Sequence, residues 1–403
     1  MTKFRVLVVS DIHMFGGEPN PSSPSWVSAM PRFGTEHRSP LKALKSLFSP
    51  NDEIDWLLCP GDLADRHDEV CQGVAWNALV DLKQSLHIRH LFATVGNHDV
   101  DSRHVDERQS LPTTALRSLE PSFPYANATN ENFANAFWAN GFAEHIEQNR
   151  DISLVVLNSS QFHGIDSGHI VDGQLVEQEW NRGRISEEAL GRLRQFAQRT
   201  TTSRNVLMLH HHVQPTDALD QDLSVLLDSN EILDHLANSQ QDWVVLHGHL
   251  HIPMLYPSAR GGEVTILSSG SAGGKTWTGN TGSTPNNQVH LLEFTDQQGI
   301  KASVLSWNWV NNVGWQPASS SEHGLPKITG FGSSISTGQA VQEVGRLLEA
   351  EDEVEWSTIV ERVPDLQFFK PSDFKRLLDE LENQGHELRY ERGTEIPLVI
   401  RRA

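Results

Sequence analysis

Short apolar runs recur along the chain, and each one ends in polar or glycine-containing residues. The runs are Phe4–Val9, Trp56–Leu58, Leu91–Val95, Ile152–Leu157, Val206–Leu209, Trp243–Leu246, Val264–Leu267, Val289–Phe294 and Ala302–Trp309. Short apolar runs bounded by turn residues are typical of buried strands. The pattern therefore predicts a core built on β-sheet.

Helical periodicity appears between several of these strands. The clearest stretch follows Ser186, a residue type that caps helix N-termini. The apolar residues on one face of this helix are Ala189, Leu190, Leu193, Phe196 and Ala197. Strands alternating with amphipathic helices predict a layered α/β core. The irregular segments Met14–Pro50 and Val100–Asn127 look like long loops after strands, where function is usually carried.

The pattern changes near the C-terminus. Residues 317–337 are rich in Ser, Gly and Pro and are predicted to link a first domain, residues 1–316, to a second, residues 338–403. Apolar residues at helical spacing predict three helices in the second domain, followed by two short strands around Gly393. We therefore expect a small α+β, winged-helix-like domain.

Length and charge narrow the function classes. The 403 residues suggest more than one domain, and the net charge of −20 argues against a general electrostatic grip on nucleic acid or an anionic membrane. No apolar run approaches the roughly 20 residues that cross a bilayer. Cys59 and Cys71, the only cysteines, provide no disulfide framework. We expect a cytoplasmic protein without a membrane partner.

Five clusters of polar residues follow predicted strands, and they share one chemistry. They are Asp11-Ile12-His13, Gly61-Asp62-Leu63-Ala64-Asp65, Gly96-Asn97-His98-Asp99, His210-His211-His212 and Gly248-His249-Leu250-His251. An α/β sheet normally builds its site at strand ends. Carboxylate, amide and imidazole groups together suit divalent metal ions. The clusters jointly predict a metal site.

The spacing within the clusters suggests how such a site is built. Asp11 with His13, and His249 with His251, are pairs two residues apart that can aim an oxygen and a nitrogen at one point. Two neighbouring cations need a shared ligand, and a carboxylate offers two oxygens. Asp62 is the candidate for this bridge.

In order and content, the five clusters resemble the calcineurin-like metallophosphoesterase superfamily across roughly the first three quarters of the chain. The resemblance implies an α-β-β-α sandwich of two mixed sheets with the metal site at the strand ends. It implies two divalent ions that activate water for attack on phosphorus. The ligands it implies are Asp11, His13, Asp62 and His251 for one ion, and Asp62, Asn97, His210 and His249 for the other.

The resemblance also implies the catalytic pair and leaves other positions open. His98 would donate a proton to the leaving oxygen or stabilise the phosphorane-like charge, with Asp65 orienting it. His210 is chosen among three consecutive histidines because the family places its ligand immediately after the strand. Arg66 and His211 are candidate substrate-binding residues. Arg66 matches the protein phosphatase branch, but His67 stands where that branch has Gly.

The leading hypothesis is a hydrolase of nucleotide or nucleic-acid phosphodiesters, with manganese expected first and iron, zinc or nickel compatible. The alternatives are a phosphomonoesterase or protein phosphatase, and an effector subunit of a multiprotein repair or defence complex. The segment from Gly338 onward carries 15 acidic and 9 basic residues, which favours protein over DNA as its partner. A homo-oligomer stays open.

Overall fold

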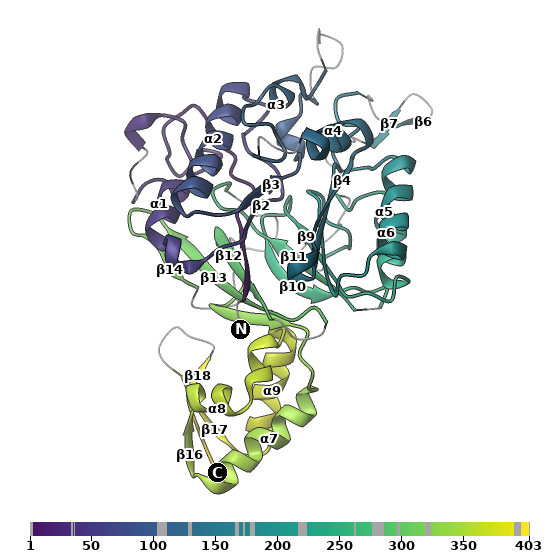
Figure 1. Cartoon of the computed structure of the whole chain (residues 1–403). Coiled ribbons are helices and arrows are strands. Elements are labelled where there is room, and N and C mark those ends of the chain that lie inside the picture. The colour runs from purple at the N-terminus through teal and green to yellow at the C-terminus, as the bar shows by residue number, and fades with distance from the viewer. Residues whose placement is uncertain are drawn as a thin grey trace.

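The structure is a computed structural model, and Figure 1 shows a large upper unit above a smaller C-terminal unit. The residues it describes are 3–33, 35, 37–102, 111–127, 131–165, 169–171, 174–177, 182–216, 224–261, 263–275, 286–295, 299–318, 324–390 and 396–402.

The first sheet combines strands from the beginning and from the end of the upper unit's sequence. In spatial order its strands are β14 (Gly314–Pro317), β13 (Ala302–Val310), β12 (Gln288–Phe294), β1 (Phe4–Val8), β2 (Trp56–Cys59) and β3 (His90–Ala93), with β15 (Ile328–Phe331) also paired to β13. Strands β1, β2 and β3 run parallel, whereas β12 pairs antiparallel with β1. The sheet is therefore mixed.

The second sheet is also mixed. Its strands are β10 (Pro253–Pro257), β11 (Val264–Ser269), β9 (Trp243–His247), β8 (Arg204–Met208), β5 (Ile152–Leu157) and β4 (Phe142–Glu147). Strands β11, β9, β8 and β5 are parallel, and β10 and β4 pair antiparallel at the edges. A separate pair is formed by β6 (His169–Val171) and β7 (Gln174–Glu177).

The central strands are apolar on both faces because each face packs against a different layer. In β5, Leu154 and Val156 belong to the core between the sheets, while Val155 and Leu157 pack toward the outer helices. Successive side chains of a strand point to opposite faces. This explains why these runs are continuously apolar rather than alternating.

Helices cover the outer faces of both sheets (Figure 1). On the side of the first sheet lie α1 (Pro40–Leu47) and α2 (Glu69–Ser85), and on the side of the second lie α5 (Glu187–Arg199) and α6 (Ser229–Ala237). Two further helices are α3 (Thr114–Arg117) and α4 (Glu131–Asn140). Ser186 caps α5 as expected, because its side chain accepts the backbone N–H of Ala189. The predicted α-β-β-α arrangement is confirmed.

The C-terminal unit has its own core. Its helices are α7 (Thr337–Ala350), α8 (Trp356–Arg362) and α9 (Pro371–Asn383), and its small sheet has the order β16 (Glu353–Glu355), β18 (Pro397–Arg401), β17 (Glu387–Tyr390). Val344, Ile359, Leu377 and Ile400 meet in this core. Three helices followed by a hairpin confirm the winged-helix-like prediction.

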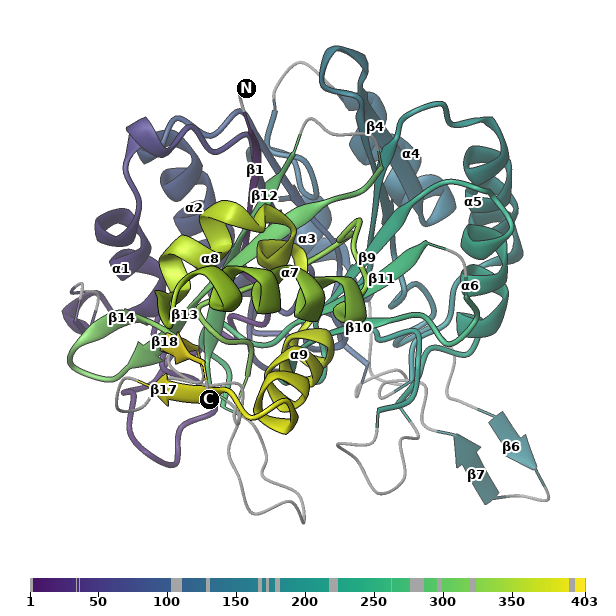
Figure 2. The same ribbon diagram turned by 90° about the horizontal axis from the view of Figure 1, so that it is seen from below.

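The segment predicted as a linker takes part in the fold. Within 317–337, β15 pairs with β13 and extends the first sheet. The C-terminal unit is bonded to it, since the Gly330 N–H donates to the Phe369 carbonyl at 2.9 Å. Viewed from below, α7, α8 and α9 lie in front of the first sheet (Figure 2). The Ser-, Gly- and Pro-rich composition concealed a strand of only four residues.

Other differences concern short or half-polar elements. The segment Met14–Pro50, predicted as a loop, contains α1, whose Leu41 and Leu44 are buried. Strands β4 and β10 were not predicted because polar or proline residues interrupt their apolar pattern. Over the described residues, no helix has both the length and the apolar character required to cross a membrane.

Candidate metal centre

The five polar clusters lie in turns that follow parallel strands of both sheets. Asp11 follows β1, Asp62 follows β2 and Asn97 follows β3, all in the first sheet. His210 and His249 follow β8 and β9 in the second sheet. Because the sheets face each other, these strand ends meet along one edge of the sandwich.

The backbone at these turns is unusual. Asp11, His13, Asp62, His249 and His251 have φ angles of 50°, 47°, 56°, 71° and 56°. The left-handed region is disfavoured for residues with a Cβ, and such strain concentrates at functional sites. Five of the seven predicted ligands adopt this conformation.

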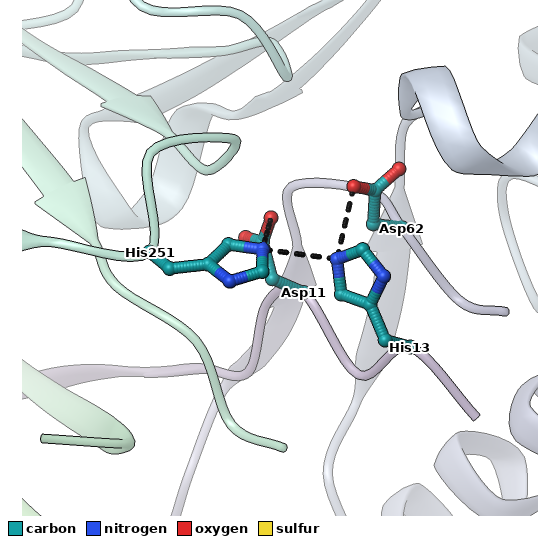
Figure 3. A group of neighbouring side chains, drawn as sticks. All are labelled: Asp11, His13, Asp62 and His251. Carbon is teal, nitrogen blue, oxygen red and sulfur yellow. Dashed lines mark hydrogen bonds and ion pairs between the residues drawn. The ribbon is translucent and has the colours of Figure 1, made fainter. Parts of the chain in front are cut away.

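The first cluster is formed by Asp11, His13, Asp62 and His251, whose side chains point toward one another (Figure 3). Their ligand atoms lie within 4.8 Å of one another. Nε2 of His13 is 2.9 Å from Nε2 of His251 and 3.2 Å from Oδ2 of Asp62. Nε2 of His251 is 3.3 Å from Oδ1 of Asp11. Two carboxylates and two imidazoles thus converge on one point.

The second cluster lies beside the first and contains Asn97, His210 and His249. Oδ1 of Asn97 is 3.0 Å from Nε2 of His210 and 3.2 Å from Nδ1 of His249. Nε2 of His210 is also 3.4 Å from Oδ2 of Asp62. The same Asp62 oxygen therefore faces an imidazole of each cluster, as a bridging carboxylate must.

Charge within the centre is organised around Asp62. Burial alone would raise the pKa of the Asp62 carboxyl, but His210 and His13 hold it well below its usual range. Burial would likewise lower the pKa of both imidazoles, but Asp62 raises that of His13 to about 10 and that of His210 to about 9. Without metal, the centre attracts protons; metal ions must displace them.

Three glycines leave room for the ligands. A Cβ on Gly96 would overlap the Asp62 carboxylate, and one on Gly248 would overlap that of Asp11. A Cβ on Gly274 would lie 2.5 Å from Cδ2 of His13. Close backbone approach, rather than conformational freedom, requires glycine at these positions.

His98 and Asp65 form a pair at the opening of the centre. Nδ1 of His98 is 3.2 Å from Oδ1 of Asp65, and its side chain is 26% exposed. Its ring lies 4.6 Å from that of His13. Burial would raise the pKa of Asp65, but hydrogen bonds from His13 and His98 keep it below its usual range. Arg66 extends outward beside them, 72% exposed, with Nε 3.9 Å from Asp65 Oδ2.

The three consecutive histidines take different places. The structure brings His210 to the second cluster, with its Nδ1 2.9 Å from the Pro60 carbonyl oxygen. His211 is fully buried, and its ring lies 4.6 Å from that of His249. The ring of His212 stacks on His249 at 5.8 Å. His211 therefore lies behind a predicted ligand, not at the opening beside Arg66.

Comparison with known proteins decides the family. A family model described as calcineurin-like phosphoesterase matches residues 4–261. The chain belongs to the calcineurin-like phosphoesterase family. A second family model, wHTH-Calcineurin_assc, matches residues 329–383 and thus begins inside the predicted linker.

Individual relatives of this phosphoesterase are distant. It is 24% identical over 211 residues to the 3′,5′-cyclic adenosine monophosphate phosphodiesterase CpdA of Haemophilus influenzae, covering 52% of this chain and 59% of that relative's length. A dimetal phosphatase from Danio rerio aligns with a TM-score of 0.49 and 11% identity, covering 78% of this chain and 98% of that chain. A purple acid phosphatase from yellow lupin seeds gives 0.48 and 9%, covering 78% and 52%.

The donor set of this phosphoesterase fits the two ions that the family's centre uses. Carboxylate, amide and imidazole donors suit first-row divalent metals. The Nε2 atoms of His13 and His251 face each other at 2.9 Å. Two imidazole nitrogens that face each other beside two carboxylates suit a cation between them, in place of the protons that the metal-free centre attracts.

Two residues that position the ligands had no predicted role. Buried Asp99 accepts the backbone N–H groups of Gly96, Asp62, Leu63 and Ala64 at 3.0, 2.9, 2.8 and 3.3 Å. Burial and the charge of Asp62 raise its pKa to about 7. Ser159 Oγ accepts the backbone N–H of His210 at 3.3 Å and lies 2.8 Å from Nδ1 of His211. Asp99 ends a recognisable motif, whereas nothing in the sequence marks Ser159.

Proposed function

We propose that this protein is a binuclear metal-dependent phosphodiesterase acting on nucleotide or nucleic-acid phosphodiesters. One observation carries the proposal: Oδ2 of Asp62 lies 3.2 Å from Nε2 of His13 and 3.4 Å from Nε2 of His210. A carboxylate placed between two ligand sets supports a pair of ions about 3.5 to 4 Å apart. Such ions, when bound, activate water and neutralise charge on phosphoryl oxygens.

The chain's own residues complete the proposed reaction. His98 stands at the opening, where its imidazole donates a proton to the leaving oxygen of the ester. Asp65 holds the ring from the Nδ1 side at 3.2 Å and stays ionised because its pKa is low. Arg66, exposed beside Asp65, is placed to bind a phosphate oxygen of the substrate.

Two observations support a diester over a monoester. The curated relative is named as a cyclic nucleotide phosphodiesterase, although the chain spans only 59% of its length. His67 stands where the protein phosphatase branch has Gly.

The net charge of −20 favours a small nucleotide over a duplex. Manganese is the metal we propose, with iron, zinc or nickel compatible with the same donors.

The test is a substrate screen on the purified full chain. It covers bis(4-nitrophenyl) phosphate, 4-nitrophenyl phosphate, cyclic nucleotides, and single- and double-stranded nucleic acid, each with Mn²⁺, Fe²⁺, Zn²⁺ or Ni²⁺. We expect diester cleavage with Mn²⁺ that falls at least about 100-fold in Asp62→Ala. The control is Asp81→Asn, an exposed carboxylate on α2. Cleavage of monoesters alone would identify a phosphatase instead.

We also propose that the C-terminal unit docks a protein partner. An apolar groove runs between the two units, lined by Met254 and Leu325 on one side and Phe374 and Leu398 on the other. Leu398 is 59% exposed, and exposed apolar surface of this kind marks interaction sites. Acidic residues of α9 border the groove, which disfavours DNA.

Affinity capture by the full chain tests the docking proposal. Leu398→Asp should lose the partner, whereas Val70→Asp, at a 74% exposed position on α2, should retain it. Sequence-specific retention of DNA that depends on Leu398 would overturn the proposal in favour of a nucleic-acid module.

A further inference from the structure

A second group of metal-ligating side chains lies where the two sheets approach each other at their edges. His90 begins β3, the edge strand of the first sheet, and His145 and Glu147 belong to β4, the edge strand of the second. The rings of His90 and His145 are 4.8 Å apart. Asn97 of the candidate metal centre follows the opposite end of β3, so this group is separate from it.

The donor atoms of the group are spaced as ligands of one ion. Oε1 of Glu147 lies 3.4 Å from Nε2 of His90 and 3.7 Å from Nε2 of His145. In a tetrahedral zinc site with bonds of about 2.0 to 2.1 Å, neighbouring donors stand roughly 3.3 Å apart. All three donor atoms lie within 4.8 Å of one another, so a cation between them would draw them closer.

The surroundings orient these donors. The hydroxyl of Tyr125 lies 2.7 Å from Nδ1 of His90, so an Nδ1–H bonded to it leaves the Nε2 lone pair facing Glu147. Trp56 Nε1 donates to Oε1 of Glu147 at 2.9 Å, and Arg89 donates to Oε2 at 2.6 Å. The ligands are therefore held by neighbours, as in built metal sites.

Protonation of the group also favours a cation. Burial, followed by the charge of His145, lowers the pKa of His90 to about 4, so its imidazole is neutral at pH 7. Burial would raise the pKa of Glu147, but the nearby His145 imidazole, 3.7 Å away, and the hydrogen bond from Trp56 lower it to about 2. Among the side chains that the structure describes, none forms a hydrogen bond with the buried Nε2 of His145.

A purely structural role for the two imidazoles would be aromatic packing. His90 stacks on Phe92 at 5.7 Å, and His145 lies 5.9 Å from Trp56. Packing alone, however, leaves the His145 Nε2 unsatisfied, which carries a free-energy cost. The guanidinium of Arg89 opposes a cation, but it is half exposed and also pairs with Asp55 at 3.0 Å.

We infer that His90, His145 and Glu147 bind one zinc-type divalent ion, separate from the candidate metal centre, that ties β3 to β4. A histidine pair with one carboxylate is a known zinc donor set, with water as the fourth ligand. The side chains of His90, His145 and Glu147 are 14%, 16% and 11% exposed, so the group lies close to the surface. The proposal does not depend on which ester the protein cleaves.

The test counts zinc bound by the full chain. Asp11→Asn, Asp62→Asn and His249→Gln are combined to disable the candidate metal centre, and the protein is stripped, loaded with Zn²⁺ and desalted. We expect one equivalent of zinc, lost when His145→Gln is added and kept when His37→Gln, at an exposed position, is added instead. Co²⁺ in place of Zn²⁺ should give the absorption of tetrahedral cobalt.

If the combined variant does not fold, the comparison moves to the otherwise unmodified chain. His90→Gln and His145→Gln should then each bind one zinc equivalent fewer than the wild type, and zinc should raise the melting temperature less in both than in His37→Gln. Equal zinc content in the wild type and both variants would overturn the inference. Phosphodiesterase activity plays no part in either readout, so the two proposals can fail independently.

Discussion

The carboxylate of Asp99 accepts the backbone N–H of Asp62 at 2.9 Å, which links a buried residue of one turn to the proposed bridging residue of another. The same carboxylate also accepts the N–H of Leu63, next to Asp62, at 2.8 Å, and the N–H of Gly96, in the turn of Asp99 itself, at 3.0 Å. The left-handed backbone of Asp62 is thus held by hydrogen bonds from outside the turn.

Replacing Asp99 by Asn should therefore weaken the centre without touching a ligand. The substitution turns one acceptor oxygen into a donor that faces backbone N–H groups. We expect a loss of about 2 kcal/mol in the free energy of unfolding and weaker metal binding. Urea denaturation and metal titration measure the two effects, with Asp81→Asn as the control. Unchanged stability in Asp99→Asn would show that these bonds do not hold the turn.

Gly96→Ala should abolish activity through steric overlap alone. The added Cβ would overlap the Asp62 carboxylate. Gly191→Ala is the matched control, because its Cβ meets nothing within 4 Å and it lies in helix α5. That control should be more stable by up to about 1 kcal/mol. Kinetics and thermal unfolding of both variants decide; full activity in Gly96→Ala would contradict the close approach described here.

The stability of the metal-free protein should fall as pH rises. In the metal-free protein, Asp62 raises the pKa of His13 to about 10 and of His210 to about 9. Stability from these protonated imidazoles is fully present below their ordinary pKa of about 6.5 and is lost as pH rises through 9 to 10. The melting temperature of the metal-free protein should therefore fall between pH 7 and 10.

Proton release provides the direct measurement of this linkage. Binding at pH 7.5 requires neutral imidazoles, so each ion should expel protons and bind more tightly as pH rises. Calorimetric titration in two buffers with different ionisation enthalpies reports the number of protons. Identical heats in both buffers would mean that the imidazoles are already neutral before the metal arrives.

His98→Asn should affect substrates according to their leaving groups. A proton donor matters most when the leaving oxygen is basic. We expect a loss of about 100-fold or more in kcat for a nucleotide diester and a smaller loss for bis(4-nitrophenyl) phosphate, whose leaving group needs little protonation. Equal losses for both esters would assign His98 to binding rather than proton donation.

Burial pattern explains which parts of the fold could be predicted. The apolar run of β5 was recognisable because both faces of the strand are buried. Strand β4, with the sequence Phe-Ala-Glu-His-Ile-Glu, is an edge strand and lacks such a run. Strand β15 forms because it pairs with β13, and local composition does not reveal tertiary contacts of this kind.

The candidate site also has features that could be predicted from the sequence and features that could not. Asp11 and His249 could be selected because ligand residue types stood at strand ends in a recognisable order. Their left-handed backbone could not be foreseen, since only the surrounding hydrogen bonds favour it. The contact of Ser159 with His211 could not be predicted either, because it forms only when β5 and β8 lie side by side.

The central claim is that Asp62 stands between two metal ions. Anomalous diffraction at the manganese edge, from crystals of the Mn²⁺-loaded protein, tests it most directly. We predict two peaks about 3.5 to 4 Å apart, one facing His13 and one facing His210, with Asp62 between them. A single peak, or two peaks that do not share Asp62, would contradict the account.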